Sequence, residues 1–571
     1  MACVRESIGW IVGESTPLKS LVIFDKSNNA PVKAGDYVVA EGPEGCVLGI
    51  VETVWSGHRM LPPSVTDPEA VYHIAEWTVQ AGGEDIYNRG SIRWLALLDP
   101  LLTKKKVVTP KTPVMPGSTI SRADPSQLAR IFSPESRGWI RLGHLAGDDT
   151  VAFHVDANGL TRHLAILAVT GGGKSNTVCV LTKRLVGQLC GTMVIFDMHG
   201  EYSNMRLPGV RIKVHKPPKL HPTKITTDEL FTLTKMTEAA VRQRRYLRWA
   251  WHTAIASYYK ILAKTTKQYD DIVGLAKNLM EALSDKGKLK NIHNMIASGK
   301  PENSEMLKKN ITMWLRQFLP VGLSEIVAEA IVENEYYPPR QVVMDSLEGA
   351  IAKLEDLEAY YSEILDVTAY TNLMDAIPPC TLTVFDLSEL DEDAADAIVS
   401  HYLRRLLIER KLAKVGAGGY RYPAIVVIEE AHVLVPKDGG RLTKYWAARV
   451  AREGRKFGLG LVLVSQRPKN VDPNVLSQTN NKIILRMVEP EDIRYVQRAS
   501  EEMSDDIASL LPTLNPGEAV ILGKMAKLPA LVKIDECSPE EKPSGGDIDI
   551  VKIWLSHKEE EDEERRILEA L

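Results

Sequence analysis

Short apolar runs separated by turn residues dominate the first part of the chain. They include SLVIFDK, GDYVVAEG, GCVLGIVETVW and IRWLALLD, and several are bounded by Gly, Pro or Asn. Runs of this length with turn signals between them are typical of the strands of a small β-barrel. We therefore predict an N-terminal β-barrel domain, together with its linker, over residues 1–145.

Longer apolar runs alternate with helical patterns from Val151 onward. LAILAVT predicts a buried strand, KSNTVCVLTKRLVGQL a helix, and GTMVIFDMHGEY a second strand. Strand, loop, helix and strand within this length form a βαβ unit with parallel strands. The same alternation returns at CTLTVFDLSEL and continues through YPAIVVIEEAHVL and GLGLVLVSQRP. These two stretches predict an interrupted α/β core made of residues 146–204 and 380–535.

Helical patterns fill residues 205–379. Thr226 and Glu229 have the spacing of a capping box, and a single long amphipathic segment runs from Glu229 to Leu262. Further helical patterns lie at 269–285, 303–319 and 339–365. We predict a helical bundle inserted into the core. A group of arginines on it belongs to a solvated helix face rather than to a nucleic-acid patch: Arg242, Arg244, Arg245 and Arg248.

Composition and charge narrow the class of protein. The 571 residues carry a net charge of −4, so a uniformly basic coat for nucleic acid is excluded, although a local basic channel is not. Six cysteines are scattered without a C-x-x-C pair, which predicts neither a disulfide framework nor a zinc site. No apolar run approaches the ~18 residues of a membrane span, and the N-terminus lacks a signal pattern. We expect a cytoplasmic protein without a membrane partner, ending in a charged tail over 536–571.

A glycine-rich segment between the first core strand and its helix carries the strongest chemical signal. AILAVTGGGKSNTV has the spacing of a phosphate-binding loop, in which backbone N–H groups at a helix N-terminus surround the phosphates. Its lysine reaches the β- and γ-phosphates and its hydroxyl holds Mg²⁺. The segment predicts an ATP site made by Thr170, Gly171, Gly172, Gly173, Lys174, Ser175 and Asn176.

The position of the first loop glycine is occupied by Ala168. A methyl group allows ordinary helical and extended dihedrals but not the positive-φ range that glycine visits freely. The alternative is a glycine-rich turn that binds nothing. Because Lys174 and Ser175 are both present, we predict a working ATP site.

Paired acids end the strand AIVVI. We predict that Glu429 supports Mg²⁺ and that Glu430 acts as the general base that polarises water. The alternative is an acidic cap on a strand end. Two adjacent carboxylates repel each other unless a cation compensates them, which favours the functional interpretation.

Polar residues flank the next strand, GLGLVLVS, on both sides. Gln466 follows it, where an amide could sense the γ-phosphate. Arg452 and Arg455 lie at the end of the preceding helix. From spacing alone, they are either arginines that reach a neighbouring subunit's nucleotide or cations that complement a helix C-terminus.

The chain resembles the HerA family. The resemblance rests on RHLAILAVTGGGKSNTV, VIFDMHGEY, VVIEEAH and AREGRKFGLGLVLVSQRP, together with the N-terminal barrel and the position of the insertion. It implies a RecA-like P-loop ATPase core of the FtsK/HerA branch, which is archaeal and bacterial. Relatives usually have Gly at position 168 and T-G-S-G-K-S where this chain has TGGGKS, and the first acid of the pair is often Asp.

The resemblance also implies roles for individual residues. Lys174 and Ser175 would bind phosphate and Mg²⁺, Glu429 would support the metal, and Glu430 would activate water. Gln466 matches the sensor, Arg455 matches the trans arginine finger, and Arg162 matches a second arginine at the nucleotide. Asp197 would be a supporting polar group.

Family membership would make the chain a homo-hexameric ring that moves duplex DNA with ATP and Mg²⁺. It would act as a translocase or helicase with a NurA-type nuclease, which docks on the barrel side, in DNA end resection for recombinational repair. A ring motor needs cations that hold backbone phosphates. The loop VPKDGGRLTK offers Lys437, Arg441 and Lys444 for DNA contact; an ordinary surface loop is the alternative.

Two other function classes fit the same fold. One is a protein-transport or assembly ATPase, which predicts no effect of DNA on hydrolysis. The other is a slow nucleotide switch that scaffolds a nuclease. The Glu429–Glu430 pair and the candidate trans arginine argue against a pure switch.

Overall fold

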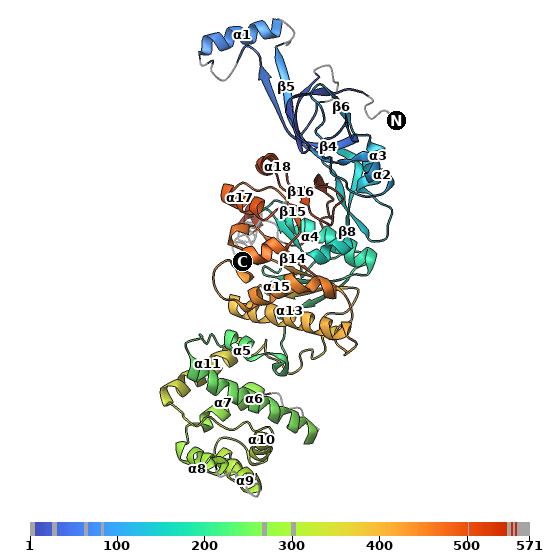
Figure 1. Ribbon diagram of the computed structural model, residues 1–571. Helices are drawn as coiled ribbons and strands as arrows, with labels where there is room; N and C mark the ends of the chain where they lie inside the picture. The colour runs from blue at the N-terminus through green and yellow to red at the C-terminus, as the bar shows by residue number, and fades with distance from the viewer. Residues whose placement is uncertain are drawn as a thin grey trace, which may run out of the picture.

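A computed structural model describes the chain in three stacked parts, with the barrel at one end, the α/β core in the middle and the helical insertion at the other end (Figure 1). The residues that it describes are 6–25, 31–61, 65, 67–80, 85–264, 271–297, 304–500, 502–544, 550–551 and 554–556. The charged tail predicted for 536–571 therefore lies largely outside the described residues.

The N-terminal part is a closed antiparallel barrel with strand order β1-β2-β5-β4-β3-β6, as predicted. Alternate side chains of its strands point inward, and Trp94 fills the barrel core and donates its indole N–H to Ser20 Oγ at 2.8 Å. The long β4–β5 pair extends beyond the barrel toward α1 (Figure 1). The strands and helices of this part are β1 (Gly9–Ser15), β2 (Lys19–Phe24), β3 (Tyr37–Gly42), β4 (Gly45–His58), α1 (Pro68–Gln80), β5 (Ile86–Leu97), α2 (Leu98–Thr103), β6 (Thr119–Arg122) and α3 (Pro125–Phe132).

The core is an eleven-stranded mixed sheet with strand order β11-β12-β10-β13-β14-β9-β15-β16-β17-β7-β8. The seven strands from β11 to β15 pair in parallel, and the four from β16 to β8 are antiparallel. Its strands are β7 (Trp139–Leu145), β8 (Asp148–Asp156), β9 (Leu164–Leu167), β10 (Thr192–Asp197), β11 (Arg211–His215), β12 (Thr381–Asp386), β13 (Ala424–Ile428), β14 (Leu459–Ser465), β15 (Asn481–Ile484), β16 (Glu518–Leu522) and β17 (Ala530–Ile534). β7 precedes the predicted boundary at 145 and yet belongs to this sheet.

Helices cover both faces of the sheet because its central strands are apolar on both sides. One face of the strands packs with α4 and the other with α13 and α15, and α5 of the insertion packs on α13. No helix among the described residues is long and apolar enough to cross a membrane. The core helices are α4 (Lys174–Thr182), which continues as the π-helical turn η2 (Lys183–Gln188), α13 (Glu392–Lys414), α14 (Ala431–Leu434), α15 (Leu442–Glu453), α16 (Pro473–Gln478), α17 (Pro490–Arg498) and α18 (Asp505–Leu510).

The insertion is helical, as predicted, but the single long helix expected from Glu229 to Leu262 is wrong. The chain forms α5 and α6 with a turn between them, in which Lys235 has a φ of 51° and interrupts the helical backbone. β11, which falls within the predicted insertion, is the edge strand of the core sheet. The helices of the insertion are α5 (Thr227–Leu233), α6 (Val241–Lys264), α7 (Ile272–Ala282), α8 (Lys286–Ala297), α9 (Ser304–Leu315), α10 (Val321–Glu333), α11 (Met344–Tyr361) and α12 (Leu373–Ala376).

The expectation of a chain without disulfides is also wrong. Cys179 is bonded to Cys537, and Cys190 is bonded to Cys380. The partners are 358 and 190 residues apart in the sequence. Spacing could not reveal these pairs, because only the folded sheet brings α4 against the segment that follows β17.

A buried ion cluster joins the insertion to the core. The predicted capping box is confirmed at Thr226, and its Glu229 also accepts hydrogen bonds from Arg404 Nε at 2.9 Å and His401 Nδ1 at 3.3 Å. Burial opposes the ionisation of Glu229, but the hydrogen bonds and charges of His401 and Arg404 prevail and hold its pKa at about 2. One carboxylate thus caps α5 and anchors it to α13.

We expect Glu229→Gln to weaken the docking of α5 on α13 by about 3 kcal/mol, because a buried cation loses its charged partner. Hydrogen exchange of the α5 amides measures this local opening. A carboxyl with a lowered pKa stabilises the fold above its ordinary pKa near 4.5, so the wild-type contribution should disappear as the pH falls toward 2. Glu348→Gln, on the exposed face of α11, should leave α5 protection unchanged; an equal effect of both variants would contradict the assignment.

Candidate functional site

The glycine-rich loop lies between β9 and α4, where a parallel strand ends and a helix begins. Gly171 has a φ of 72° and Gly173 a φ of 104°, so both positions require glycine. Ala168 is buried and keeps a φ that suits a side chain; its N–H bonds the carbonyl of Ser465 at 3.3 Å. The loop therefore has the backbone of a phosphate-binding loop without the first glycine.

Two of the positions that depart from the expected family pattern, Ala168 and Gly172, lie against each other. A Cβ at Gly172 would lie 2.9 Å from the Ala168 methyl and 3.0 Å from the Val169 carbonyl oxygen. The methyl at 168 therefore leaves no room for a side chain at 172. Alanine at one position and glycine at the other are sterically complementary.

The side chains of Lys174 and Ser175 open the helix after the loop. Lys174 Nζ donates to the carbonyls of Ala168 at 3.2 Å and Val169 at 3.1 Å, and the Ser175 hydroxyl donates to Glu201 Oε2 at 2.9 Å. Burial lowers the pKa of Lys174, while nearby carboxylates, among them Glu430, oppose that shift. Lys174 is thus held at the loop by two hydrogen bonds, and the third N–H of its ammonium group can donate to a ligand.

The two adjacent acids have opposite environments. Glu429 is enclosed, and burial raises its pKa to about 8 although Tyr202 donates a hydrogen bond to it. For Glu430, burial also opposes ionisation, but His432 and Lys174 outweigh it and lower the pKa. Glu430 is therefore the carboxylate that is ionised at neutral pH and can accept a proton from water.

Polar contacts hold Glu430 in place. Gln466 Nε2 donates to Glu430 Oε1 at 3.3 Å, and Gln466 Oε1 accepts from the Thr170 hydroxyl at 2.6 Å. His432 Nδ1 lies 3.0 Å from Glu430 Oε2. Glu430 has a φ of 45°, a left-handed conformation that is strained in residues other than glycine and that recurs at functional sites.

These groups surround one cavity of about 350 Å³. Sequence reasoning predicted Asp197 as a supporting group, and the structure places it in the lining, where its carboxylate accepts the N–H of Tyr202 at 2.8 Å and of His199 at 3.3 Å. The same reasoning missed Glu201, Tyr202 and His199, although the segment VIFDMHGEY carries all three. Residues of the predicted site that line the cavity are Thr170, Gly171, Gly173, Lys174, Ser175, Asn176, Asp197, Glu429, Glu430 and Gln466.

The cavity fits a nucleotide with Mg²⁺. The positive-φ glycines direct backbone around a space that anions can fill, and Lys174 and Ser175 stand at its edge. Glu429 could support the metal. Among the described residues no three histidine, cysteine or carboxylate side chains converge as a metal site. Mg²⁺ would therefore take its other ligands from Ser175, water and phosphate, as is usual for this ion.

Asn176 has a structural role besides lining the cavity. Its Nδ2 donates to the carbonyl of Asp535 at 2.9 Å, and its Oδ1 accepts the N–H of Cys537 at 3.0 Å. Lys183 and Arg184, further along the same helix, pair with Glu541 and Asp535. The segment after β17 is thus fastened along the helix that carries Lys174 and Ser175.

Arg162 and Arg455 do not line this cavity. Arg162 ends η1 (Ala157–Arg162), before β9, and Arg455 lies in η5 (Gly454–Phe457), before β14. β9 and β14 are parallel neighbours, so both arginines stand at the amino edge of the sheet, whereas the cavity is at the carboxyl edge. A strand of four residues alone separates the two edges by roughly 13 Å.

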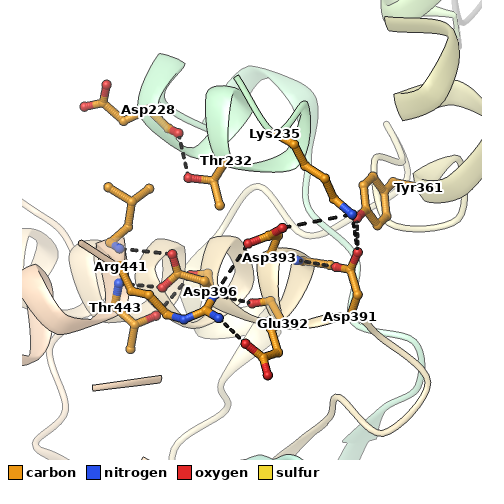
Figure 2. Close-up of polar contacts among 12 residues, drawn as sticks. Asp228, Thr232, Lys235, Tyr361, Asp391, Glu392, Asp393, Asp396, Arg441 and Thr443 are labelled. Carbon is orange, nitrogen blue, oxygen red and sulfur yellow. Dashed lines mark hydrogen bonds and ion pairs between the residues drawn. The ribbon is translucent and has the colours of Figure 1, made fainter. Parts of the chain in front are cut away.

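The predicted DNA-contact loop begins after α14, and two of its three cations are paired within the chain. Figure 2 shows Arg441 directed at Glu392 and Asp393 on α13; its Nη1 lies 3.5 Å from Asp393 Oδ1. Lys444 Nζ lies 3.2 Å from Asp472 Oδ2. Lys437 is exposed and forms no ion pair in the described part of the chain.

Comparison with known proteins decides the family. A family model described as the central domain of helicase HerA matches residues 140–406. The DNA double-strand break repair helicase HerA of Sulfurisphaera tokodaii is 38% identical over 563 residues, which cover 98% of this chain and 99% of that protein. The chain belongs to the HerA family.

Other relatives agree over nearly the whole chain. The HerA of Sulfolobus acidocaldarius is 36% identical, covering 97% of this HerA-family chain and 98% of that protein. The HerA of Pyrococcus furiosus is 30% identical, covering 93% and 92%. Among solved structures, VirB4 of Thermoanaerobacter pseudethanolicus matches with a TM-score of 0.43 and 16% identity, covering 72% of this chain and 100% of that one.

We expect Gly172→Ser alone to lower the affinity for a fluorescent ATP analogue roughly tenfold, because overpacking against Ala168 costs about 1–3 kcal/mol. Ala168→Gly combined with Gly172→Ser should restore most of the affinity, since the methyl that blocks the serine is removed. Titrations of the wild type, both single variants and the double variant give the coupling between the positions. Additive effects would show that the two positions do not compensate each other.

Proposed function

We propose that this HerA-family chain hydrolyses ATP to move along duplex DNA during the repair of double-strand breaks. The main observation is one cavity, lined from four adjacent parallel strands, that combines Lys174 and Ser175 with Glu430 and Gln466. Its relatives are DNA double-strand break repair helicases, which supports duplex DNA as the polymer along which the chain moves.

Each residue has a role in this proposal. Lys174 and the loop N–H groups would hold the phosphates, and Ser175 with Glu429 would hold Mg²⁺. Bound Mg²⁺ would neutralise charge on the β- and γ-phosphates. Glu430 accepts a proton from the attacking water, and Gln466 keeps its carboxylate oriented. We assign Gln466 as the sensor of the γ-phosphate because it lines the same cavity.

A ring accounts for the position of the two arginines. Arg162 and Arg455 stand at the edge opposite the cavity, and Arg455 is exposed. A head-to-tail arrangement of copies would bring the amino edge of one core to the cavity of the next, where an arginine stabilises transition-state charge. We therefore propose that the chain works as a homo-hexamer in which both arginines act in trans.

The proposed nuclease and DNA partners follow from membership of the HerA family. We propose that a NurA-type nuclease binds on the barrel side of the ring and that the two act together in DNA end resection. The DNA-contact loop would meet phosphates through Lys437, with Arg441 and Lys444 shaping the loop through their ion pairs.

We expect linear duplex DNA to stimulate steady-state ATP hydrolysis by the wild type, and Lys174→Ala and Glu430→Gln to abolish it. The lysine variant should also lose nucleotide binding, whereas the glutamine variant should retain it because Glu430 acts on water. A rate of ATP hydrolysis that is the same with and without DNA would favour a protein-transport or assembly ATPase. A wild type without hydrolysis would favour a nucleotide switch that scaffolds a nuclease.

Mixed rings test the trans arginine. We expect Arg455→Ala and Lys174→Ala to be inactive alone, but rings co-assembled from equal amounts should regain up to about a quarter of wild-type hydrolysis, since one interface in four joins an intact loop to an intact arginine. The control is a mixture of Glu430→Gln with Lys174→Ala. Both residues belong to the same cavity, so that mixture should stay inactive. Inactive rings in both mixtures would contradict action in trans.

A further inference from the structure

A basic cleft lies beside the nucleotide cavity on the carboxyl side of the sheet. It has a volume of about 320 Å³ and is lined by four cations, Lys437, Lys469, Arg494 and Arg498. Two acids, Asp438 and Glu491, also line it, so the formal charges leave an excess of two positive charges. A cleft with this balance in a chain of net charge −4 is a local concentration of positive potential.

Three of the four cations form no direct ion pair among the described residues. Lys469 pairs with Glu491 at 2.9 Å, whereas Lys437, Arg494 and Arg498 form no ion pair within the described ranges. Arg494 and Arg498 are exposed, and their spacing of four places them on one face of α17. Like charges at this spacing destabilise a helix. A bound anion would relieve the repulsion; Arg498 alone is also favoured by its place at the helix C-terminus.

The cleft is rigidly built on a single segment, Gln466–Val471. The N–H of Lys469 donates to Asp492 on α17 at 3.0 Å, and the carbonyl of Val471 accepts the Tyr495 hydroxyl at 2.9 Å. The N–H of Lys437 donates to the carbonyl of Asn470 at 2.7 Å. All four cations are therefore attached to this segment directly or through one contact.

The same segment begins at the nucleotide cavity. Gln466 contacts both Glu430 and Thr170, and the cleft starts three residues later. A change at the γ-phosphate position that moves Gln466 would act on the backbone that carries Lys469 and positions α17. Arg441 differs from the arginines of α17, because its guanidinium forms ion pairs with Glu392 and Asp393 (Figure 2).

We propose that this cleft binds the backbone phosphates of duplex DNA, chiefly through Arg494 and Arg498, and that Gln466–Val471 links it to the nucleotide cavity. The proposal rests on the proposed DNA motor and adds a contact surface on α17, outside the loop that carries Lys437. Arginine suits this role because its planar group can bond two phosphate oxygens at once. Contacts of this kind hold a duplex without reading its sequence.

The test is the salt dependence of duplex binding, followed by fluorescence anisotropy of a labelled linear duplex. We expect Arg494→Ala with Arg498→Ala to weaken binding about tenfold at 0.1 M salt and to reduce the slope of log K against log salt by about 0.9 for each phosphate that the protein no longer neutralises. Arg494→Lys with Arg498→Lys should keep most of the slope, because the charges remain. Hydrolysis without DNA should stay close to the wild-type rate.

The matched control is Arg242→Ala with Arg245→Ala on α6, which removes the same charge from exposed arginines of the insertion. It should leave binding and slope unchanged. If the α17 variant binds duplex DNA as tightly as the wild type, the proposed role of the cleft is wrong. It is also wrong if the control variant loses as much affinity as the α17 variant. Neither result would contradict the proposed DNA motor. If light scattering shows a smaller assembly for the α17 variant than for the wild type, α17 belongs to the interface between copies, and the proposed role of the cleft in DNA binding is wrong. A wild type that does not bind duplex DNA would overturn both proposals.

Discussion

Parallel pairing of β13, β14 and β9 is the constraint on which the candidate site depends. Ile428 is in register with Leu463, and Ser465 is in register with Leu167. The residues that follow these strand ends therefore emerge at one edge: the acid pair, Gln466 and the glycine-rich loop. Ligands of open α/β sheets bind at this carboxyl edge because the loops there converge and the following helices direct their N-termini at the same space. The same alignment sends Arg162 and Arg455 to the opposite edge.

Environment, rather than residue type, separates the two acids. Glu429 and Glu430 are adjacent and chemically identical, yet burial raises the pKa of one, while His432 and Lys174 lower that of the other. Both line the same cavity, but Glu429 accepts the Tyr202 hydroxyl, whereas Glu430 has His432 and Lys174 as its neighbours. A bound Mg²⁺ would offset the burial that raises the pKa of Glu429, whereas Glu430 is ionised without a metal and can accept a proton from water.

Helix α13 connects the insertion with the loop that carries Arg441. Its carboxylate Asp391 accepts from Lys235 at 2.9 Å and from Tyr361 at 2.5 Å, both in the insertion (Figure 2). One turn further, Asp396 accepts the N–H groups of Leu442 at 3.0 Å and Thr443 at 2.8 Å and so caps α15. The insertion and the start of α15 are therefore both bonded to the first turns of α13.

Much of the architecture could be predicted because its signals are local. The barrel, the βαβ start of the core, the capping box at Thr226 and the P-loop residues all depend on neighbours within a few positions. The break between α5 and α6 could not be predicted because the amphipathic pattern continues across it. Lys235 adopts a positive φ there, and nothing about a lysine in this sequence indicates that conformation. Glu201 and Tyr202 were missed although they lie near Asp197, because nothing in VIFDMHGEY indicates which side chains turn inward.

The sequence by itself determined the family, the order of the elements and the groups that could bind phosphate and activate water, since these follow from short motifs with fixed spacing. Only the tertiary structure decided which distant residues meet. It paired Cys179 with Cys537, placed the methyl of Ala168 against Gly172, engaged Arg441 with α13 and left the arginines of α17 without an ion pair in the described chain. Each of these outcomes depends on how the sheet and its helices pack, and no local pattern specifies that packing.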